Sequence, residues 1–384
     1  MSRMKLKDIA VEKNERVDNP SQSPYSIFVG LEHYDSGEAT IRRYGSTEML
    51  ESTMKVFHTG DILVARRNVY LRRAATVDFD GLTSGDSIVL HIENEAYRRI
   101  IPFVLNTDDF WNYANQHADG SMSKRLSPKL LMEYEFSVPA ENLEQISEIL
   151  WAMERTKNAY RELIAKTDDL LKAEFVEMFG DPASNPKGWI KCKVQDVMVG
   201  KVSNGFFAKP TDYSPDGNAG IICVGDVVNR KYSNIEGLRR ANASDSDYAK
   251  YAVHYGDALF CRSSLVKEGI GKASIVPQNA PKDVLFECHV IRVPLNTTMV
   301  LPEFFQALTT TLFFRQQMMD KSKTATMTTI GQKDIVSTDI YVPEMSLQEQ
   351  FVELSKQSDK SILAAQQTLI ELTYAQKALM KKVF

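Results

Sequence analysis

Extended apolar stretches and closely spaced pairs of cysteines are both missing from this 384-residue sequence. No apolar stretch approaches the roughly 18–20 residues that a membrane-spanning helix needs. The first residues, MSRMKLKDIAVEKNE, lack the apolar core of a secretory signal, so a cytoplasmic location is expected. The four cysteines show no C-x-x-C spacing, and we expect buried free thiols rather than a metal site. They are Cys192, Cys223, Cys261 and Cys288.

Motifs that carry catalysis are absent as well. The chain has no N-P-P-[FY] motif of the kind with which adenine methyltransferases hold a target base, no paired-histidine metal motif and no nuclease-like carboxylate cluster. GIGKAS at 269–274 resembles a phosphate-binding loop. That motif needs Gly at position 266 and Ser or Thr at position 273, where Val266 and Ala273 stand. The sequence therefore shows none of these catalytic motifs, and we expect the chain to bind no metal or cofactor itself.

The net charge of the whole chain is small, but charged residues are unevenly distributed along it. The formal net charge of −4 argues weakly against a nucleic-acid partner. Residues 42–73, however, contain seven basic and three acidic side chains, whereas residues 74–119 contain two basic and eight acidic. A domain with this asymmetry can present a cationic face. A solvated surface of mixed charge explains the same counts equally well.

A long internal repeat is the main positive signal. HTGDILVAR at 58–66 and HYGDALFCR at 254–262 share the pattern H-x-G-D-x-L-x-x-R at an offset of 196 residues. Further matches occur in the same order, and their offsets only increase, as expected of a duplicated unit with small loop insertions. They are LKDI with VQDV (188), IFVGLE with ICVGD (195), LSPKLLMEYEFSVP with IGQKDIVSTDIYVP (204) and EQI with EQF (205). This period is too long for a solenoid, so we predict two copies of a whole domain with its tail.

The first part of each copy is predicted to be a mixed domain. Strand patterns occur at 62–65 and 88–92, and again at 258–261 and 290–293, between glycine-containing turns. A helical pattern begins at Leu301. The predicted class is α+β, with two duplicated domains on mixed, mainly antiparallel sheets.

The second part of each copy is predicted to be a long helix. Apolar or tolerated residues recur there in alternating steps of four and three. These heptad seams are Ile146, Leu150, Met153, Lys157, Tyr160, Ile164, Thr167, Leu171, Phe175 and Met178, and then Phe351, Leu354, Ile362, Ala365, Leu369, Leu372, Gln376, Leu379 and Val383. A single helix cannot bury so narrow a stripe, so we predict a long antiparallel two-helix coiled coil that separates the domains. The predicted parts are a first domain (1–138), a central helix (139–180), a linker (181–188), a second domain (189–342) and a C-terminal helix (343–384).

This organisation resembles the DNA specificity subunit of Type I restriction–modification systems (HsdS) over essentially the whole chain. The sequence motifs that carry the resemblance are PKGW at 186–189, GDILVAR and GDALFCR within the repeated H-x-G-D-x-L-x-x-R motif, and VPAENLEQI and VPEMSLQEQF at the starts of the long helices. One departure is that members of the family often have two prolines before each long helix, whereas each copy here has one.

The resemblance implies a division of labour. Such a subunit carries two target-recognition domains, reads an asymmetric bipartite site on double-stranded DNA and catalyses nothing itself. Two methyltransferase subunits use S-adenosylmethionine and flip out an adenine in each half-site. Restriction/translocase subunits that use ATP and Mg²⁺ complete the enzyme. No membrane is involved. The two domains here differ after the shared arginine, which agrees with an asymmetric target.

The candidate DNA contacts lie in the loops that differ between the copies. Base readout in the major groove needs paired donors and acceptors, and phosphate contact suits cations and hydroxyls. An ordinary surface loop is the alternative for each residue. The candidates are Arg66, Arg67, Asn68, Tyr70, Arg72, Arg73, Ser123, Lys124 and Arg125 in the first copy, and Asn204, Phe206, Lys209, Arg262, Ser263, Ser264, Lys267, Lys272, Lys321, Lys323 and Thr326 in the second.

The repeated H-x-G-D-x-L-x-x-R motif places an arginine and a histidine at equivalent positions in both copies. Arg66 and Arg262 are shared by the copies, so we expect them to contact a phosphate or the domain frame rather than to choose bases. An ion pair with Asp61 and Asp257, respectively, is the alternative. The histidines that open both phrases are expected to stabilise turns rather than to catalyse.

Two other functions fit the same sequence. One is an assembly scaffold, in which the helices and the end domains bind only proteins. The other is an enzyme whose site matches no known motif.

Overall fold

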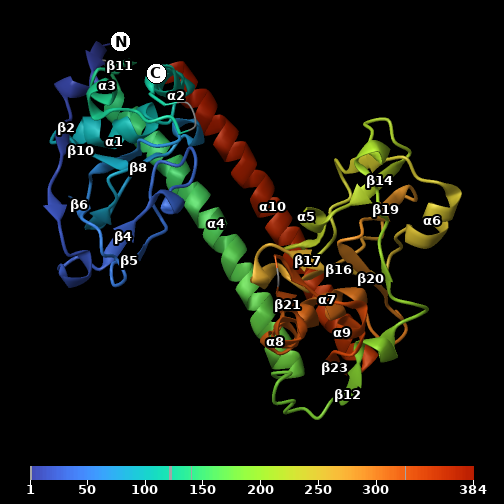
Figure 1. Ribbon diagram of the computed structural model, residues 1–384. Coiled ribbons are helices and arrows are strands. Elements are labelled where there is room, and N and C mark those ends of the chain that lie inside the picture. The colour runs from blue at the N-terminus through green and yellow to red at the C-terminus, as the bar shows by residue number, and fades with distance from the viewer. Residues whose placement is uncertain (1, 121–122, 140, 325) are drawn as a thin grey trace. The chain divides into compact units, whose positions relative to one another are not determined.

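The computed structural model describes residues 2–120, 123–139, 141–324 and 326–384 (Figure 1). The chain divides into two compact units, Met1–Leu163 with Ala365–Phe384, and Ile164–Ala364. Both units combine short helices with mainly antiparallel strands, so the predicted α+β class is confirmed. Among the described residues, no helix has an apolar stretch that could traverse a lipid bilayer.

The first unit is built on a four-stranded antiparallel sheet in the order β2-β10-β7-β8. A second sheet, β3-β6-β9-β4-β5, contains one parallel pair, β4 with β9. The first strand, β1, pairs with the last, β11. The strands are β1 (Ser2–Lys5), β2 (Val11–Lys13), β3 (Arg16–Val17), β4 (Ile27–Val29), β5 (Gly45–Ser46), β6 (Met54–Phe57), β7 (Ile62–Ala65), β8 (Ala74–Thr76), β9 (Gly81–Thr83), β10 (Ser87–His91) and β11 (Glu135–Val138).

Short α-helices complete the first unit as far as the structure describes it. Thr107 caps the second of them, because its side chain accepts a hydrogen bond from the backbone N–H of Phe110. Phe110 and Trp111 of that helix are fully buried in the main core, against Ile62 and Ile88 of the central sheet. The helices are α1 (Glu95–Val104), α2 (Asp108–His117) and α3 (Pro128–Met132).

The second unit repeats this plan. Its four-stranded sheet has the order β13-β20-β16-β18, its smaller sheet has the order β15-β14-β19 with β14 and β19 parallel, and β12 pairs with β23. The strands are β12 (Ile190–Lys193), β13 (Ser203–Asn204), β14 (Ala219–Ile222), β15 (Arg239–Ala241), β16 (Asp257–Cys261), β17 (Ser263–Ser264), β18 (Ala273–Ile275), β19 (Val284–Phe286), β20 (Val290–Pro294), β21 (Lys323–Thr324), β22 (Thr328–Thr329) and β23 (Asp339–Val342). The short helices are α5 (Val224–Val227), α6 (Asp245–Tyr251), α7 (Pro302–Thr310), α8 (Leu312–Lys321) and α9 (Gln332–Val336).

The structure confirms the predicted duplication and strands. The expected strands are β7, β10, β16 and β20, and the two central sheets have the same strand order. The helical pattern from Leu301 forms two short helices, α7 and α8. Thr311 separates them, because its backbone is extended and its side chain caps α8 by accepting from the N–H of Phe314.

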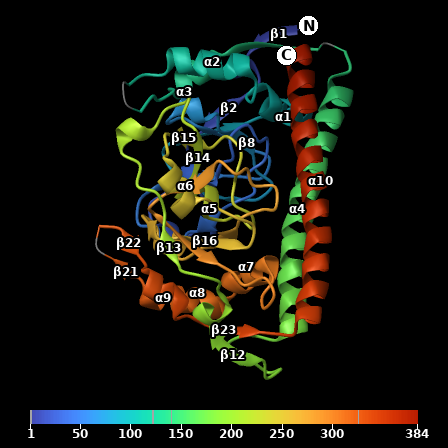
Figure 2. The same cartoon turned by 90° about the vertical axis from the view of Figure 1, so that its right-hand side faces the viewer.

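The two long helices are also confirmed, as α4 (Leu143–Phe179) and α10 (Met345–Val383). In the first unit, the Nε2 atom of Gln376 donates to the Leu150 carbonyl of α4. In the second unit, Phe351 packs edge-on against Phe175 and Phe179. Early residues of α4 thus meet late residues of α10 and the reverse, so the helices run antiparallel in each unit (Figure 2).

A buried polar cluster interrupts the apolar seam of the first unit. Lys157 is 1% exposed, and its Nζ lies 2.8 Å from Glu154 Oε2, 2.9 Å from Gln376 Oε1 and 3.3 Å from Glu38 Oε2. Glu38 belongs to the loop before β5, and Arg161 of α4 also pairs with it. One lysine thus joins both long helices to the first domain.

We predict that Lys157→Ala destabilises the first unit by about 3 kcal/mol, because it leaves the buried Glu154 carboxylate without its main cation. Chemical denaturation followed by tryptophan fluorescence measures this. Arg155→Ala is the matched control, since Arg155 is an exposed cation of the same helix in the same unit and pairs with Glu148, and it should change stability by less than about 0.5 kcal/mol. Equal effects of the two variants would contradict the role of the buried lysine.

Candidate nucleic-acid interface

The repeated H-x-G-D phrase forms the same tight turn in both copies. The N–H of Asp61 donates to the His58 carbonyl at 2.9 Å, and Asp61 Oδ2 accepts from the His58 N–H at 2.8 Å. In the second copy His254 and Asp257 make the same two bonds at 3.0 and 2.8 Å. The glycine of each turn has a left-handed backbone, with φ of 88° and 95°. The prediction that the histidines stabilise turns is confirmed, and they do so through their backbone N–H and C=O groups.

The alternative in which Asp61 and Asp257 pair with Arg66 and Arg262 is not what the structure shows, because both aspartates face other side chains. The second carboxylate oxygen of Asp61 lies 2.8 Å from His91 Nδ1, and Asp257 lies 4.0 Å from Arg292. Arg66 and Arg262 instead begin the loops at the other ends of β7 and β16. Their carbonyls accept hydrogen bonds from the N–H groups of Leu126 and Ile330, at 2.8 and 3.0 Å respectively.

The loop between β7 and β8, residues Arg66–Arg73, is here called the first hairpin loop. It contains a single 3-10 turn, Val69–Leu71, between two left-handed residues, Asn68 and Arg72, with φ of 55° and 51°. Non-glycine residues rarely adopt this conformation, so the surrounding structure must hold them. The turn exposes Tyr70 at the loop tip.

Cations gather beside the first hairpin loop. Arg67 and Arg125 form a backbone bridge and share one carboxylate, Asp86, at 3.6 and 3.2 Å. Ser123 lies between them and Asn68, since its Oγ accepts from Arg67 Nε at 2.9 Å and donates to the side chain of Asn68 at 3.0 Å. Two arginines facing a single acid leave a net positive charge at this surface.

Two further cations of this site point elsewhere. Lys124 is exposed and donates to the Asn115 carbonyl at 3.0 Å. Arg72 pairs with the exposed Asp108 at the start of α2. Surface pairs of this kind are weak, so both side chains can exchange their partners for a phosphate.

The loop between β16 and β18, residues Arg262–Lys272, is called the second hairpin loop. Ser263 of β17 pairs with Thr329 of β22, as Arg67 pairs with Arg125 in the first copy. Ser264 Oγ donates to the Val266 carbonyl at 2.7 Å and accepts from its N–H, which folds the tip back on itself. The tip exposes Leu265 and Val266, with Lys267 beside them.

One arginine, buried in the first copy and partly buried in the second, holds each hairpin loop through its backbone carbonyls. Arg73 donates to the carbonyls of Arg67 and Leu31, both at 2.9 Å. In the second copy Arg315 of α8 donates to the carbonyls of Glu268 and Ile270 at 3.0 and 2.7 Å. Burial lowers the pKa of both guanidinium groups. The structure therefore gives Arg73, proposed from sequence as a DNA contact, the role of a loop clamp.

Other candidates are distributed unevenly in the second unit. Phe206 is 8% exposed and belongs to a core cluster, whereas its neighbour Phe207 is 70% exposed. Lys321 is held by three oxygens of the α9 region at 3.0–3.2 Å, and burial lowers the pKa of its ammonium group. Phe206 and Lys321 therefore stabilise the domain where the structure places them.

The remaining candidates of the second copy fall into two groups. Lys209, Lys267, Lys323 and Thr326 are exposed. The others are partly or largely buried: Asn204 lies in β13, Ser263 is 8% exposed, Lys272 donates to the side chain of Asn229, and Arg262 donates to the Cys288 carbonyl.

Sequence reasoning missed Arg315, Phe207 and the apolar tip of the second loop. Arg315 lies more than 40 residues from the carbonyls that it holds, so no local pattern points to it. Strand parity could have found Phe207, since the side chain next to a buried one on an extended segment points outward.

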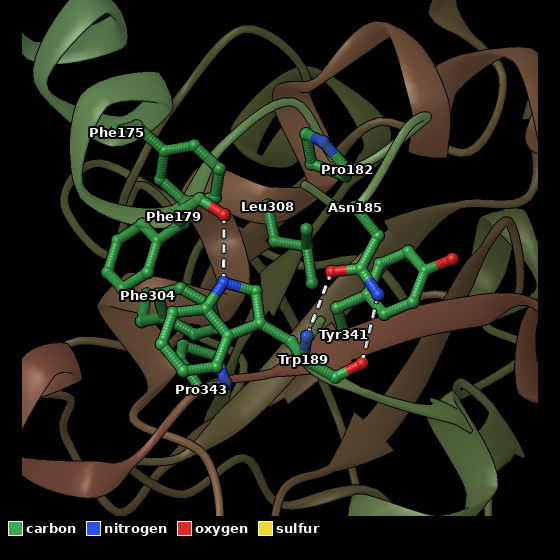
Figure 3. A pocket seen from close by; sticks show the side chains of 9 residues that line it. All are labelled: Phe175, Phe179, Pro182, Asn185, Trp189, Phe304, Leu308, Tyr341 and Pro343. Atoms are coloured by element: carbon green, nitrogen blue, oxygen red, sulfur yellow. Dashed lines mark hydrogen bonds between the residues drawn. The ribbon is translucent and has the colours of Figure 1, made fainter. Parts of the chain in front are cut away.

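The apolar pocket of the second unit is part of the structural frame (Figure 3). It lies where α4 ends and the second domain begins. Trp189 of the PKGW wording donates from Nε1 to the Phe179 carbonyl at 2.8 Å, and Asn185 bonds both the N–H and the C=O of Trp189 at 3.0 Å. Over the described part of the chain, no group of three or more His, Cys, Asp or Glu side chains could hold a metal ion.

We predict that Arg73→Ala loosens the first hairpin loop while the second is unchanged. The amide hydrogens of Leu71 and Arg72, which donate to Asn68 and Val69, should exchange roughly tenfold faster, because the loop loses hydrogen bonds that contribute about 1.5 kcal/mol. Hydrogen exchange read by mass spectrometry measures this. Arg125→Ala, which removes only an exposed guanidinium, should leave the exchange unchanged. An unaltered loop in the Arg73 variant would contradict the clamp.

Comparison with known proteins bears on the fold. No model of a known protein family matches the sequence, and no curated protein matches it. Two solved structures are similar over the whole chain. One comes from work on the structural basis of complex assembly and conformational transition of the type I R-M system. It matches with a TM-score of 0.53 and 18% identity, and the match covers 100% of this chain and 97% of that chain. The other, the Type-I restriction-modification system S subunit from M. genitalium, has a TM-score of 0.55 and 11% identity and covers 100% and 96%. The chain thus has the fold of a Type I restriction–modification S subunit.

Proposed function

We propose that this chain is the DNA-binding specificity subunit of a Type I restriction–modification enzyme. It reads an asymmetric bipartite site and recruits methyltransferase and restriction subunits. The observation that carries the proposal is the pair of hairpin loops. They stand on equivalent turns and strands and are anchored by equivalent backbone bonds, yet they differ in sequence. A constant frame with variable loops is what a reader of two different half-sites requires.

The chemistry of the two loops supports an asymmetric target. The first offers Arg67, Arg125 and Asn68, whose forked donors suit guanine and adenine edges or phosphates. The second offers Lys267 and Lys323 together with hydroxyl groups, and residues 263–272 of its loop include no arginine. These surfaces present different donor patterns, so they should prefer different bases.

Catalysis belongs to the partners in this proposal. S-adenosylmethionine serves the methyltransferase subunits, and ATP and Mg²⁺ serve the restriction subunits. What this chain supplies is position, since a base can be flipped and methylated only where the loops fix the complex on the duplex.

The outer face of α10 offers a surface for a methyltransferase subunit. Ile370 and Tyr374 lie one turn apart and are 51% and 70% exposed. Large apolar side chains on an exposed helix face are typical of a protein interface. Neighbouring charges such as Lys377 and Glu371 would form its polar rim.

Methylome sequencing of cells with and without this gene tests the function. Loss of a single bipartite adenine-methylation motif on deletion would support the proposal and would reveal the target. An unchanged methylome, combined with no duplex binding by the purified chain and its methyltransferase partner, would favour the assembly scaffold. Methylation by the isolated chain would favour an enzyme.

We predict that replacing Arg67, Lys124 and Arg125 with Ala weakens duplex binding and flattens its salt dependence. Each lost phosphate contact should reduce the slope of log affinity against log salt by roughly 0.9. Binding titrations at several salt concentrations, with the methyltransferase partner present, measure the slope. Arg155→Ala, on the surface of α4 and paired with Glu148, is the control. A slope equal to that of the unmodified chain would exclude these cations from the interface.

A further inference from the structure

Both hairpin loops end in a pair of exposed apolar side chains. Tyr70 and Leu71 are 59% and 39% exposed in the first loop, and Leu265 and Val266 are 85% and 63% exposed in the second. The 196-residue offset of the repeat aligns Val266 with Tyr70. An isolated exposed apolar residue needs no explanation. Exposed apolar pairs at equivalent tips of two loops that otherwise differ suggest a shared use.

The loops are built to keep these tips in place. In the first, the left-handed residues Asn68 and Arg72 flank the tip, and the Arg73 guanidinium bonds the carbonyl of Arg67 below it. In the second, Gly271 has φ of 63°, and a Cβ there would approach Met318 to 2.8 Å. The Arg315 guanidinium bonds the Glu268 and Ile270 carbonyls. An apolar tip on a rigid loop loses little conformational entropy when it binds.

The positive charge around the tips suits a nucleic acid better than an apolar surface of a protein partner. The first tip lies on the loop that carries Arg67, next to the segment with Lys124 and Arg125. The second tip is followed directly by Lys267, and its loop begins with β17, which pairs with β22, the strand beside Lys323 of β21. Cations near an apolar tip can bind the two phosphate backbones while the tip reaches the bases between them.

We propose that the two apolar pairs enter a groove of duplex DNA and contact base pairs, Tyr70–Leu71 in one half-site and Leu265–Val266 in the other. This inference rests on the proposed function and extends it by naming specificity-determining residues that make no hydrogen bonds to bases. Apolar side chains recognise bases either through the thymine methyl group in the major groove or as wedges between base steps in the minor groove.

Two double variants of the full chain test the proposal, Tyr70→Ala with Leu71→Ala and Leu265→Ala with Val266→Ala. The chain is combined with its methyltransferase partner, and its preferred site is selected from a random duplex library. Each variant should bind that site roughly ten- to a hundredfold more weakly. The base preference should relax in one half-site only, and the salt slope should not change, because no phosphate contact is lost.

Matched controls are available in the same units. Met49 and Leu312 are 90% and 88% exposed but lie outside the hairpin loops, and their replacement with Ala should leave binding unchanged. Duplexes with uracil in place of thymine separate the two kinds of contact. If the tips contact thymine methyl groups, the unmodified chain should bind the uracil duplex more weakly. If the tips are wedges between base steps, the unmodified chain should bind both duplexes equally, and the Ala variants should bend an end-labelled duplex less.

The failures of the two proposals can be distinguished. If the unmodified complex binds no duplex, the proposed function is wrong and this inference falls with it. If the unmodified complex binds and both double variants keep its affinity and base preference, the inference alone is wrong. Double variants that bind DNA normally but lose the methyltransferase partner would also overturn it and would make the tips a protein contact.

Discussion

The carboxylates of Asp61 and Asp257 hold the element on which each domain depends. Each is almost completely buried, with 1% and 4% exposure, and each closes the turn that starts the central strand of its sheet. A buried carboxylate without partners is costly, so the turn forms only where the backbone N–H of the histidine and the left-handed glycine are both available. The strand that follows then carries the hairpin loop at its far end. The repeated motif therefore fixes the turn at the start of this strand and the position of the hairpin loop at its end.

Backbone atoms connect that strand to the rest of each domain, and this leaves the loop side chains free to vary. The carbonyls of Arg66 and Arg262 accept from Leu126 and Ile330. Backbone bridges then continue between residue 67 and residue 125, and between residue 263 and residue 329. Since any residue can supply a carbonyl and an amide, the copies keep the same pairing while their side chains diverge.

Features set by periodicity could be predicted from the sequence. The duplication, the central strands and both long helices follow from patterns of apolar residues and turns, and even Lys157 sits at the expected seam position. The site was harder to predict, because local charge does not say which way a side chain points. Arg73 counts as one of seven basic residues in its segment, yet it is buried. Phe206 and Phe207 differ only in which side of the chain they face.

The clamps show why long-range contacts escape a sequence reading. Both loops need a cation beneath their carbonyls, but the second loop is longer, running from 262 to 272 where the first runs from 66 to 73. In the short loop, Arg73 at its own end reaches the Arg67 carbonyl. In the longer loop, Lys272 occupies the equivalent place and bonds Asn229 instead, and Arg315 of α8 reaches the loop carbonyls. The same physical requirement is met from different places in the chain, so the length of a loop decides which residue must hold it.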